Sequence, residues 1–425
     1  MTVLSRRAMM ALPAALAMPA VARAQAATTI TVHYAQPNIY KESYDAIMAG
    51  FAKKEPNIRV NFVTTPNYEE GAQLLLRQAA TNQLPDLSYQ GFNRLRVFAE
   101  RGIAQDLAPL LKAEAADPAT LGYSKNLLDL AHFGGMQAGL AYAASNPICY
   151  FNADLVKRAG GDPDNFPKDW DGVLALAAKI DALGDGIDGL WFTWNGDDWM
   201  FSALLFGHGG RMLNADETDV AFAGAEGLAS LKLLERMVKQ AGMPNLTAVA
   251  ARQAFAAGKI GMLFQTTALV RGTAAAVGNN FELRTTGMPV IDAEKGRLPT
   301  GGAAGMLTAK DPARREAAMK FLRYSTGPEG QAMMVKASGY LPCNQIAIDD
   351  PQYLGAFYRE NPLFVASVKQ IPISIPWYAF PGTNSVRVTQ TMVDNMARIV
   401  EGKATPEQVL PDMASEVRRL LPRRS

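Results

Sequence analysis

The sequence contains few of the side chains on which metal and thiol chemistry depends, with only 3 histidines and 2 cysteines in 425 residues. The histidines, His33, His132 and His208, are scattered, and none is spaced from another ligand type in a way that indicates zinc. Cys149 and Cys343 could pair in an oxidising compartment, although unpaired cysteines commonly pack as small apolar residues. The residues therefore predict no cofactor and no metal site, and they leave a disulfide open.

The motifs of several common enzyme classes are also missing. The chain has no G-x-S-x-G, no G-x-x-x-x-G-K and no H-E-x-x-H sequence. Residues 184–189 have the spacing G-x-G-x-x-G, but they follow a helical pattern instead of a strand, so we interpret them as a turn. Paired carboxylates leave no sequence signature, so a secreted hydrolase of glycosides or phosphodiesters stays an open alternative.

The first 24 residues have the order of an export signal. Arg6 and Arg7 precede an apolar stretch that runs to Ala20, and residues 22–24 have the small-x-small pattern that signal peptidase requires. This stretch is too short for a membrane anchor, which needs roughly 20 apolar residues. We therefore predict a twin-arginine signal peptide at residues 1–24 and a mature protein in the periplasm.

Removing this leader changes the charge of the chain. The full sequence has 42 Lys+Arg and 40 Asp+Glu, and the leader holds three arginines and no acid, so the net charge falls from +2 to −1. A nearly neutral chain without an internal basic run argues against a nucleic-acid partner. No later segment is long and apolar enough to span a membrane.

Strand and helix patterns alternate at the start of the mature chain. About 400 residues exceed what one core usually organises, so we expect two domains. The alternation predicts parallel strands, because a crossover helix returns the chain to the same edge of a sheet. The expected strands are residues 30–34, 58–63 and 85–89, and the expected helices are residues 40–53 and 68–81.

A second strand-and-helix unit begins near residue 147, where a β-prone run leads to Asn152, a good helix-capping residue. Helical patterns follow at residues 170–183 and 225–240, and the glycine-rich residues 296–308 suit a crossing or a bend. The fold class we expect is α/β with two lobes, each a mainly parallel sheet flanked by helices, and a ligand cleft between them. The predicted lobes are residues 28–144 plus 303–344 and residues 147–300 plus 346–425.

Several short motifs occur in order between about residues 30 and 420. They are Phe51-x-Lys53-x-x-Pro56-x-Ile58-x-Val60, Leu84-Pro85-Asp86, Tyr150-Phe151-Asn152-x-Asp154-Leu155, Pro167-x-x-Trp170, Ala254-Phe255-x-x-Gly258-Lys259-x-Gly261-Met262 and Gly339-Tyr340-Leu341-Pro342. Their order and spacing resemble the extracellular solute-binding proteins of ABC importers that bind sugars and polyols. The resemblance implies a monomeric, non-enzymatic protein that closes on a small hydrophilic solute and docks on a membrane permease.

Within that class the chain is most similar to the glycerol-3-phosphate-binding proteins. The resemblance implies ligand contacts at Tyr68, Ser145, Thr266, Thr267, Gly301, Gly302, Tyr340 and Arg387. A guanidinium fork, hydroxyl donors and backbone amides are the groups that a phosphate monoester needs, and this set contains all three. One departure is Gln90-Gly91-Phe92-Asn93, where that family places a glutamate; losing it removes an acceptor for ligand hydroxyl groups.

A tryptophan cluster supports a second interpretation. Trp194 and Trp199 flank the polar residues 195–198, and aromatic faces stack on sugars while acids accept sugar hydroxyls. Trp191 is expected to lie in a buried strand instead. The first predicted ligand is glycerol-3-phosphate or a glycerophosphodiester, and a neutral sugar or oligosaccharide is the alternative.

Overall fold

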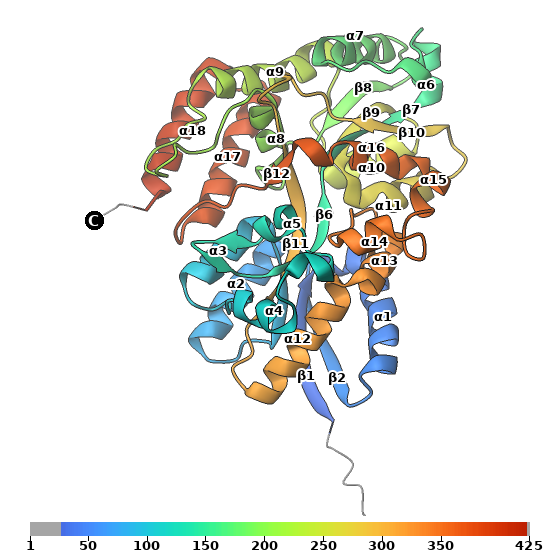
Figure 1. Ribbon diagram of the computed structural model, residues 1–425. Helices are drawn as coiled ribbons and strands as arrows, with labels where there is room; N and C mark the ends of the chain where they lie inside the picture. Colours follow the sequence, from blue (N-terminus) through green and yellow to red (C-terminus); the bar gives the residue numbers. More distant parts are fainter. Residues whose placement is uncertain (1–26, 423–425) are drawn as a thin grey trace, which may run out of the picture.

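The computed structural model describes residues 27–422 and consists of two lobes, one above the other in Figure 1. The predicted signal peptide at residues 1–24 lies outside the described residues. A six-stranded sheet forms the centre of the first lobe, and a four-stranded sheet forms the centre of the second. The two-lobed α/β fold expected from the sequence is therefore present.

The first-lobe sheet has the strand order β12-β11-β3-β1-β2, with β6 also paired to β11. β1 is parallel to β2 and β3, as the helical crossovers predict, whereas β11 is antiparallel to β3 and β6. The strands are β1 (Thr28–Ala35), β2 (Ile58–Thr65), β3 (Leu87–Gly91), β6 (Leu140–Ser145), β11 (Leu298–Leu307) and β12 (Ser374–Pro376), with a separate ribbon of β4 (His132–Phe133) and β5 (Met136–Gln137).

Helices cover this sheet, and most of them bury an apolar face. In the first of them, Tyr40, Tyr44, Ile47 and Phe51 recur at helical spacing and are buried. The helices of this lobe are α1 (Pro37–Lys54), α2 (Tyr68–Ala80), α3 (Phe92–Glu100), α4 (Ala108–Glu114), α5 (Lys125–Asp129), α12 (Pro312–Thr326), α13 (Pro328–Ala337) and α14 (Gln345–Asp349).

The second-lobe sheet corrects one expectation, because it is not mainly parallel. Its order is β10-β7-β9-β8, and β7 is antiparallel to both of its neighbours, whereas β8 and β9 are parallel. The chain enters this sheet along β7 directly from the first lobe, and two helices then reverse its direction before β8. The strands are β7 (Pro147–Asn152), β8 (Asp188–Phe192), β9 (Ile260–Thr266) and β10 (Leu283–Gly287).

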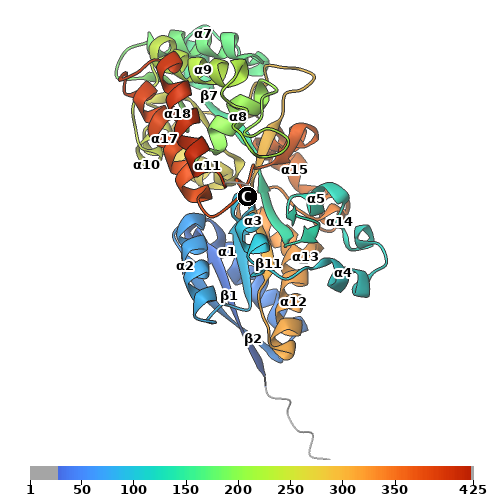
Figure 2. The ribbon, with the colours of Figure 1, turned by 90° about the vertical axis from the view of Figure 1, so that its left-hand side faces the viewer.

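The second lobe also carries the helices at the end of the chain. Figure 2 shows α17 and α18 beside α9, and all three pack against one another. The helices of this lobe are α6 (Ala153–Arg158), α7 (Trp170–Asp181), α8 (Trp199–Gly207), α9 (Ala225–Ala241), α10 (Ala248–Ala256), α11 (Val270–Val277), α15 (Phe357–Glu360), α16 (Val365–Lys369), α17 (Ser385–Val400) and α18 (Pro406–Leu420).

The chain passes between the lobes at several points. Asn146 separates β6 from β7, and β11 extends from Leu298 in the second-lobe core to Leu307 in the first-lobe core. Ala347 and Leu354 pack in the first-lobe core, although the predicted boundary at residue 346 assigns them to the second lobe. The last crossing therefore lies further along the chain, because these apolar residues complete the packing around α13.

Three smaller expectations are also resolved by the structure. Residues 184–186 form a turn between α7 and β8 with positive φ angles of 77°, 56° and 67°, and Trp191 is fully buried in β8. Cys149 lies in the core of the second lobe and Cys343 in that of the first, and both are free and buried. The two cysteines do not form a disulfide.

Within residues 27–422, no group of three or more histidine, cysteine or acidic side chains is arranged to hold a metal ion. No helix in that range is both long and apolar enough to cross a bilayer.

Candidate ligand-binding cleft

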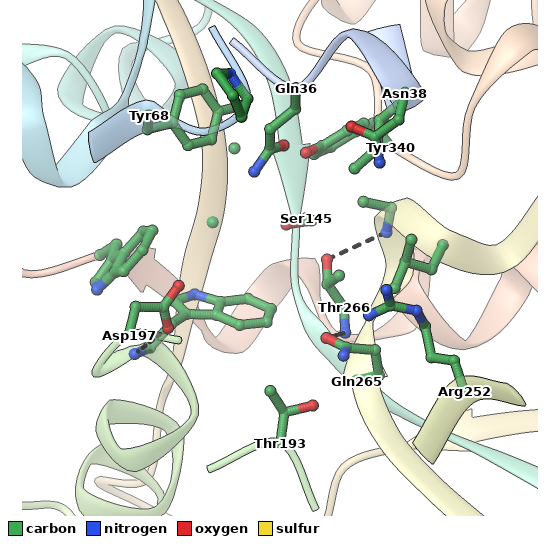
Figure 3. Close-up of a pocket in the computed structure, with 18 of the residues that line it drawn as sticks. Gln36, Asn38, Tyr68, Ser145, Thr193, Asp197, Arg252, Gln265, Thr266 and Tyr340 are labelled. Atoms are coloured by element: carbon green, nitrogen blue, oxygen red, sulfur yellow. Dashed lines mark hydrogen bonds between the residues drawn. The ribbon is translucent and has the colours of Figure 1, made fainter. Parts of the chain in front are cut away.

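A cavity of about 280 Å³ lies between the two lobes and is lined by residues from both. Figure 3 shows Tyr68, Gln36 and Tyr340 on one side of the gap and Asp197, Gln265 and Arg252 on the other. Ser145 lies between the two groups, on the strand that leads from one lobe to the other. This placement allows a small molecule to contact both lobes at once.

The first-lobe wall is built from tyrosines that already have partners. The Tyr40 and Tyr68 hydroxyls are 2.8 Å apart and hydrogen-bonded, and the Tyr40 and Tyr340 rings stack with centroids 5.0 Å apart and planes 10° apart. Asn67 caps α2 by accepting a hydrogen bond from the Glu70 amide, which fixes Tyr68 at the first helical position. Burial raises the pKa of both Tyr68 and Tyr340, so their hydroxyls are neutral near pH 7.

Gln36 adds a polar group to the same wall. It lies in the left-handed region with φ 58° and ψ 57°, directly before Pro37 begins α1. Its buried Oε1 atom has no hydrogen-bond partner among the described residues. A side chain held in an uncommon backbone conformation, with an unsatisfied oxygen beside the cavity, is consistent with a ligand contact.

Two glycines form the floor of the cleft where β11 meets β6. A Cβ atom at Gly301 would lie 2.9 Å from the Ser145 Oγ atom and 3.1 Å from the Trp199 ring. Gly302 has φ +120°, and a Cβ atom there would lie 2.0 Å from the Ala143 carbonyl oxygen. Gly302 therefore has to be glycine, because a side chain there would meet the backbone, whereas a side chain at Gly301 would displace Ser145 and Trp199 from their places in the cleft.

The second-lobe wall combines two indole rings with a carboxylate. The Trp199 and Trp377 ring centroids are 6.3 Å apart with planes inclined by 56°. Both indole Nε1 atoms are buried; that of Trp199 has no hydrogen-bond partner among residues 27–422, whereas Trp377 interacts with the buried Asp198 carboxyl group and lowers its pKa. Asp197 accepts a hydrogen bond of 2.9 Å from the Trp199 amide, and burial raises the pKa of its carboxyl group. This wall has donors that a ligand can satisfy.

Arg252 is the cation of this wall, and it extends from α10. Burial lowers the pKa of its guanidinium, and no described carboxylate forms an ion pair with it. Thr266 lies close to it at the end of β9, where its Oγ1 atom accepts a hydrogen bond of 3.2 Å from the Ala268 amide. An unpaired guanidinium in a partly buried cleft favours an anionic ligand.

Most of the residues predicted from the sequence lie together in this cavity. Those that line it are Tyr68, Ser145, Trp199, Thr266, Gly301, Gly302 and Tyr340. Thr267 does not line it, because its buried hydroxyl group instead accepts a hydrogen bond of 3.3 Å from the Asn146 amide at a lobe crossing. Trp194 does not line it either, because its side chain is buried in the second-lobe core.

Arg387 also lies outside the cavity lining, so the structure does not place it at the predicted anion site. On α17 the buried residues include Ser385, Val388, Thr389 and Met392. A helix turns by 100° per residue, which places Arg387 on the face opposite these buried positions, where its side chain is exposed. The cleft instead receives its cation from Arg252.

Sequence reasoning missed Arg252, Trp377, Gln36 and Asn38. Arg252 did carry one signal, since it is a lone cation on a helix of small residues without an acid three or four positions away. Trp377 lies in an irregular segment that has no periodicity to place it. Gln36 and Asn38 carry no local sequence pattern that indicates a ligand contact, apart from their positions before and after Pro37.

Comparison with known proteins identifies the family of the chain. The family model for bacterial extracellular solute-binding proteins matches residues 46–364. The chain belongs to this family. The members of the family bind solutes, which is the role that the inter-lobe cleft suits.

One relative found by sequence and two solved structures are similar over nearly the whole chain. The sn-glycerol-3-phosphate-binding periplasmic protein UgpB of Escherichia coli K12 is 23% identical over 440 residues, covering 96% of each chain. UgpB from Mycobacterium tuberculosis in complex with glycerophosphocholine has a TM-score of 0.82 at 20% identity, covering 92% of this chain and 98% of that one. The cyclic alpha-maltosyl-1,6-maltose binding protein of Arthrobacter globiformis has a TM-score of 0.77 at 22% identity, covering 92% and 98%. These likenesses confirm the two-lobed binding-protein fold and the resemblance noted in the sequence.

Proposed function

We propose that this protein captures a phosphorylated glycerol, either glycerol-3-phosphate or a glycerophosphodiester, and delivers it to the permease of an ABC importer. The observation that carries the proposal is the unpaired guanidinium of Arg252, which lines a cleft that otherwise offers mostly neutral polar groups. In this proposal the protein is a carrier and not an enzyme. It acts in the periplasm after export by the twin-arginine route.

The groups around the cleft match the two ends of such a ligand. A phosphate oxygen accepts charge-assisted hydrogen bonds from Arg252, and these are roughly twice as strong as bonds between neutral groups. The glycerol hydroxyl groups can donate to Asp197 and exchange hydrogen bonds with Tyr68 and Ser145. UgpB proteins of two other bacteria are named or described as binding ligands of this class, which supports the same choice.

Closure of the lobes accompanies binding in this proposal. A ligand that contacts both walls is bound more tightly by the closed form and therefore shifts the population toward it. A micromolar affinity corresponds to about 8 kcal/mol, which is enough to offset a modest cost of closure. Arg96 of α3 and Glu217 of the second lobe, 2.6 Å apart, form an ion pair that also joins the lobes.

A neutral sugar or oligosaccharide is the second candidate, and the indole pair favours it. Trp199 and Trp377 present two rings to the cavity, and Asp197, which also lines it, can accept hydrogen bonds from sugar hydroxyl groups. Rings and acids of this kind suit the C–H faces and hydroxyls of a pyranose. The same groups also suit a glycerol chain, so the guanidinium distinguishes the two candidates.

A thermal-shift panel tests the proposed function. The panel contains glycerol-3-phosphate, two glycerophosphodiesters, maltose and glucose, each tested against the purified mature protein. We expect stabilisation by the phosphates and little change with the sugars, because a ligand that binds only the folded state raises its melting temperature. Stabilisation by sugars alone would contradict the proposal. The same mixtures are assayed over hours at stoichiometric protein, where release of a phosphate monoester and an alcohol from a diester, of phosphate from glycerol-3-phosphate, or of glucose from maltose would show a hydrolase instead.

A further inference from the structure

A second cavity of about 550 Å³ adjoins the cleft on the side of Arg252. It lies between α10 and α11, and it shares Asn38, Arg252 and Leu269 with the cleft. Arg252 therefore belongs to the wall of both cavities. An anion bound at its guanidinium has space on either side, toward the cleft and toward the second cavity.

The lining of the second cavity is neutral apart from this arginine. Its apolar part comes from small side chains such as Val249, Ala256 and Ala276. Among the described residues that line it there is no acid, no lysine and no aromatic ring. Asn280 adds a polar amide, whose Nδ2 atom already donates to the Ala256 carbonyl at 2.9 Å.

The number of substituents on phosphorus decides which ligand uses both cavities. A phosphate monoester has one organic substituent and a charge of about −1.5 to −2 near pH 7. A phosphodiester has two organic substituents and a single negative charge. One unpaired guanidinium with space on both sides matches the diester in charge and in shape.

We infer that Arg252 holds the phosphate of a glycerophosphodiester whose glycerol lies in the cleft and whose second alcohol, a neutral one, occupies the cavity between α10 and α11. This inference rests on the proposed function and narrows its substrate class. A cationic second alcohol is disfavoured, because the second cavity offers no carboxylate or aromatic ring to a cation and places the Arg252 charge beside it.

The ligand test is calorimetry of the mature protein with three phosphates. Glycerophosphoglycerol carries a neutral second alcohol, glycerophosphocholine a cationic one, and glycerol-3-phosphate none. We expect glycerophosphoglycerol to bind at least about tenfold more tightly than glycerol-3-phosphate, because its second alcohol buries additional carbon atoms. We also expect it to bind more tightly than glycerophosphocholine.

The variant test uses two adjacent exposed alanines on α11. Ala276 lines the second cavity, whereas Ala275 lines a different groove beside α1. Ala276→Phe fills the second cavity, and we expect it to lower the diester affinity by about tenfold or more while the monoester affinity changes by less than about twofold. Ala275→Phe is the matched control, and the ratio of diester to monoester affinity should stay at its original value.

The outcomes separate this inference from the function on which it rests. If glycerol-3-phosphate binds as tightly as glycerophosphoglycerol, or if Ala276→Phe leaves the affinity ratio unchanged, the second cavity is not a ligand site and the inference is wrong. If glycerophosphocholine binds most tightly, the inference that the second alcohol is neutral is wrong. If none of the three phosphates binds while a sugar does, the proposed function itself fails.

Discussion

The two walls of the cleft differ in how far their polar groups are satisfied before a ligand arrives. On the first-lobe wall, the Tyr68 hydroxyl is hydrogen-bonded to Tyr40, and the Tyr340 ring is stacked. On the second-lobe wall, the indole Nε1 atom of Trp199 has no described partner, and Arg252 has no described counter-ion. Apart from the unsatisfied Oε1 atom of Gln36, the first wall is pre-organised, whereas the second gains most of its polar contacts from the ligand.

This difference indicates which wall contributes more to the free energy of ligand binding. A buried donor without a partner costs about 1–3 kcal/mol, and a ligand that supplies the missing acceptor recovers it. A hydroxyl group that gives up a protein partner to bind the ligand gains much less free energy, because it already had a hydrogen bond. We therefore expect substitutions on the second-lobe wall to weaken binding more than substitutions on the first.

The largest expected effect on affinity comes from Arg252→Gln. The amide keeps a donor but loses the charge and the fork, so we expect the affinity for a glycerophosphodiester to fall by roughly a hundredfold. Isothermal titration calorimetry measures this change. Arg387→Gln serves as the control, and its affinity should match that of the wild type because Arg387 lies outside the cavity lining. An equal loss of affinity in both variants would show that Arg252 is not the specific anion contact of the second-lobe wall.

An intermediate effect is expected from Trp199→Phe. Phenylalanine keeps an aromatic ring in the second-lobe core but has no Nε1 donor, so we expect about a fivefold to tenfold loss of affinity. Calorimetry at a fixed temperature gives the ratio to wild type. Unchanged affinity would mean that the buried indole donor does not face the ligand.

A small effect on affinity is expected from Tyr68→Phe on the first-lobe wall. The hydroxyl is already bonded to Tyr40, so we expect an affinity loss of only about twofold, together with a decrease of about 1 kcal/mol in the free energy of unfolding. Urea denaturation and calorimetry on the same preparation separate the two quantities. A loss as large as that of Arg252→Gln would reverse the comparison of the walls.

We expect Asp198→Asn to have almost no effect on affinity but to change how the free energy of unfolding depends on pH. Asp198 is buried behind the second wall, and burial first, then the neighbouring Asp197 charge, raises its pKa to about 7 from an ordinary value of 3.8. Between about pH 4 and pH 7 the folded state therefore holds a proton that the unfolded state has lost, and this residue makes stability fall as pH rises.

His33 has the opposite effect, because burial lowers its pKa to about 4 from 6.5, so its contribution to stability rises with pH between those values. The informative quantity is thus the difference between Asp198→Asn and wild type in free energy of unfolding. This difference should grow in favour of the variant from pH 4 to pH 7, by up to roughly 4 kcal/mol. A difference that is constant with pH would show that Asp198 titrates normally.

Local patterns were sufficient for most of the elements and for part of the site. The alternation at residues 30–34 and the helical spacing at residues 40–53 are set by neighbours in sequence, and both elements are found as β1 and α1. Tyr68, Ser145 and Tyr340 came from motifs that a whole family shares, and they line the cleft.

The rest depends on contacts between distant parts of the chain. Whether Arg252 or Arg387 faces the cleft depends on how α10 and α17 are rotated against the second-lobe core, and each residue changes that direction by 100°. The direction of β7 within its sheet depends on where the chain enters the second lobe. A residue pattern read along the chain contains neither fact.

The most direct test of the account is the choice between an anionic and a neutral ligand by the wild-type protein. Calorimetric titrations with glycerophosphoglycerol and with maltose, in the same buffer, measure this choice in one experiment. We expect one-to-one binding of the diester, at least about a hundredfold tighter than any binding of maltose. Tight binding of maltose with no heat from the diester would contradict the central claim that Arg252 makes this cleft an anion site.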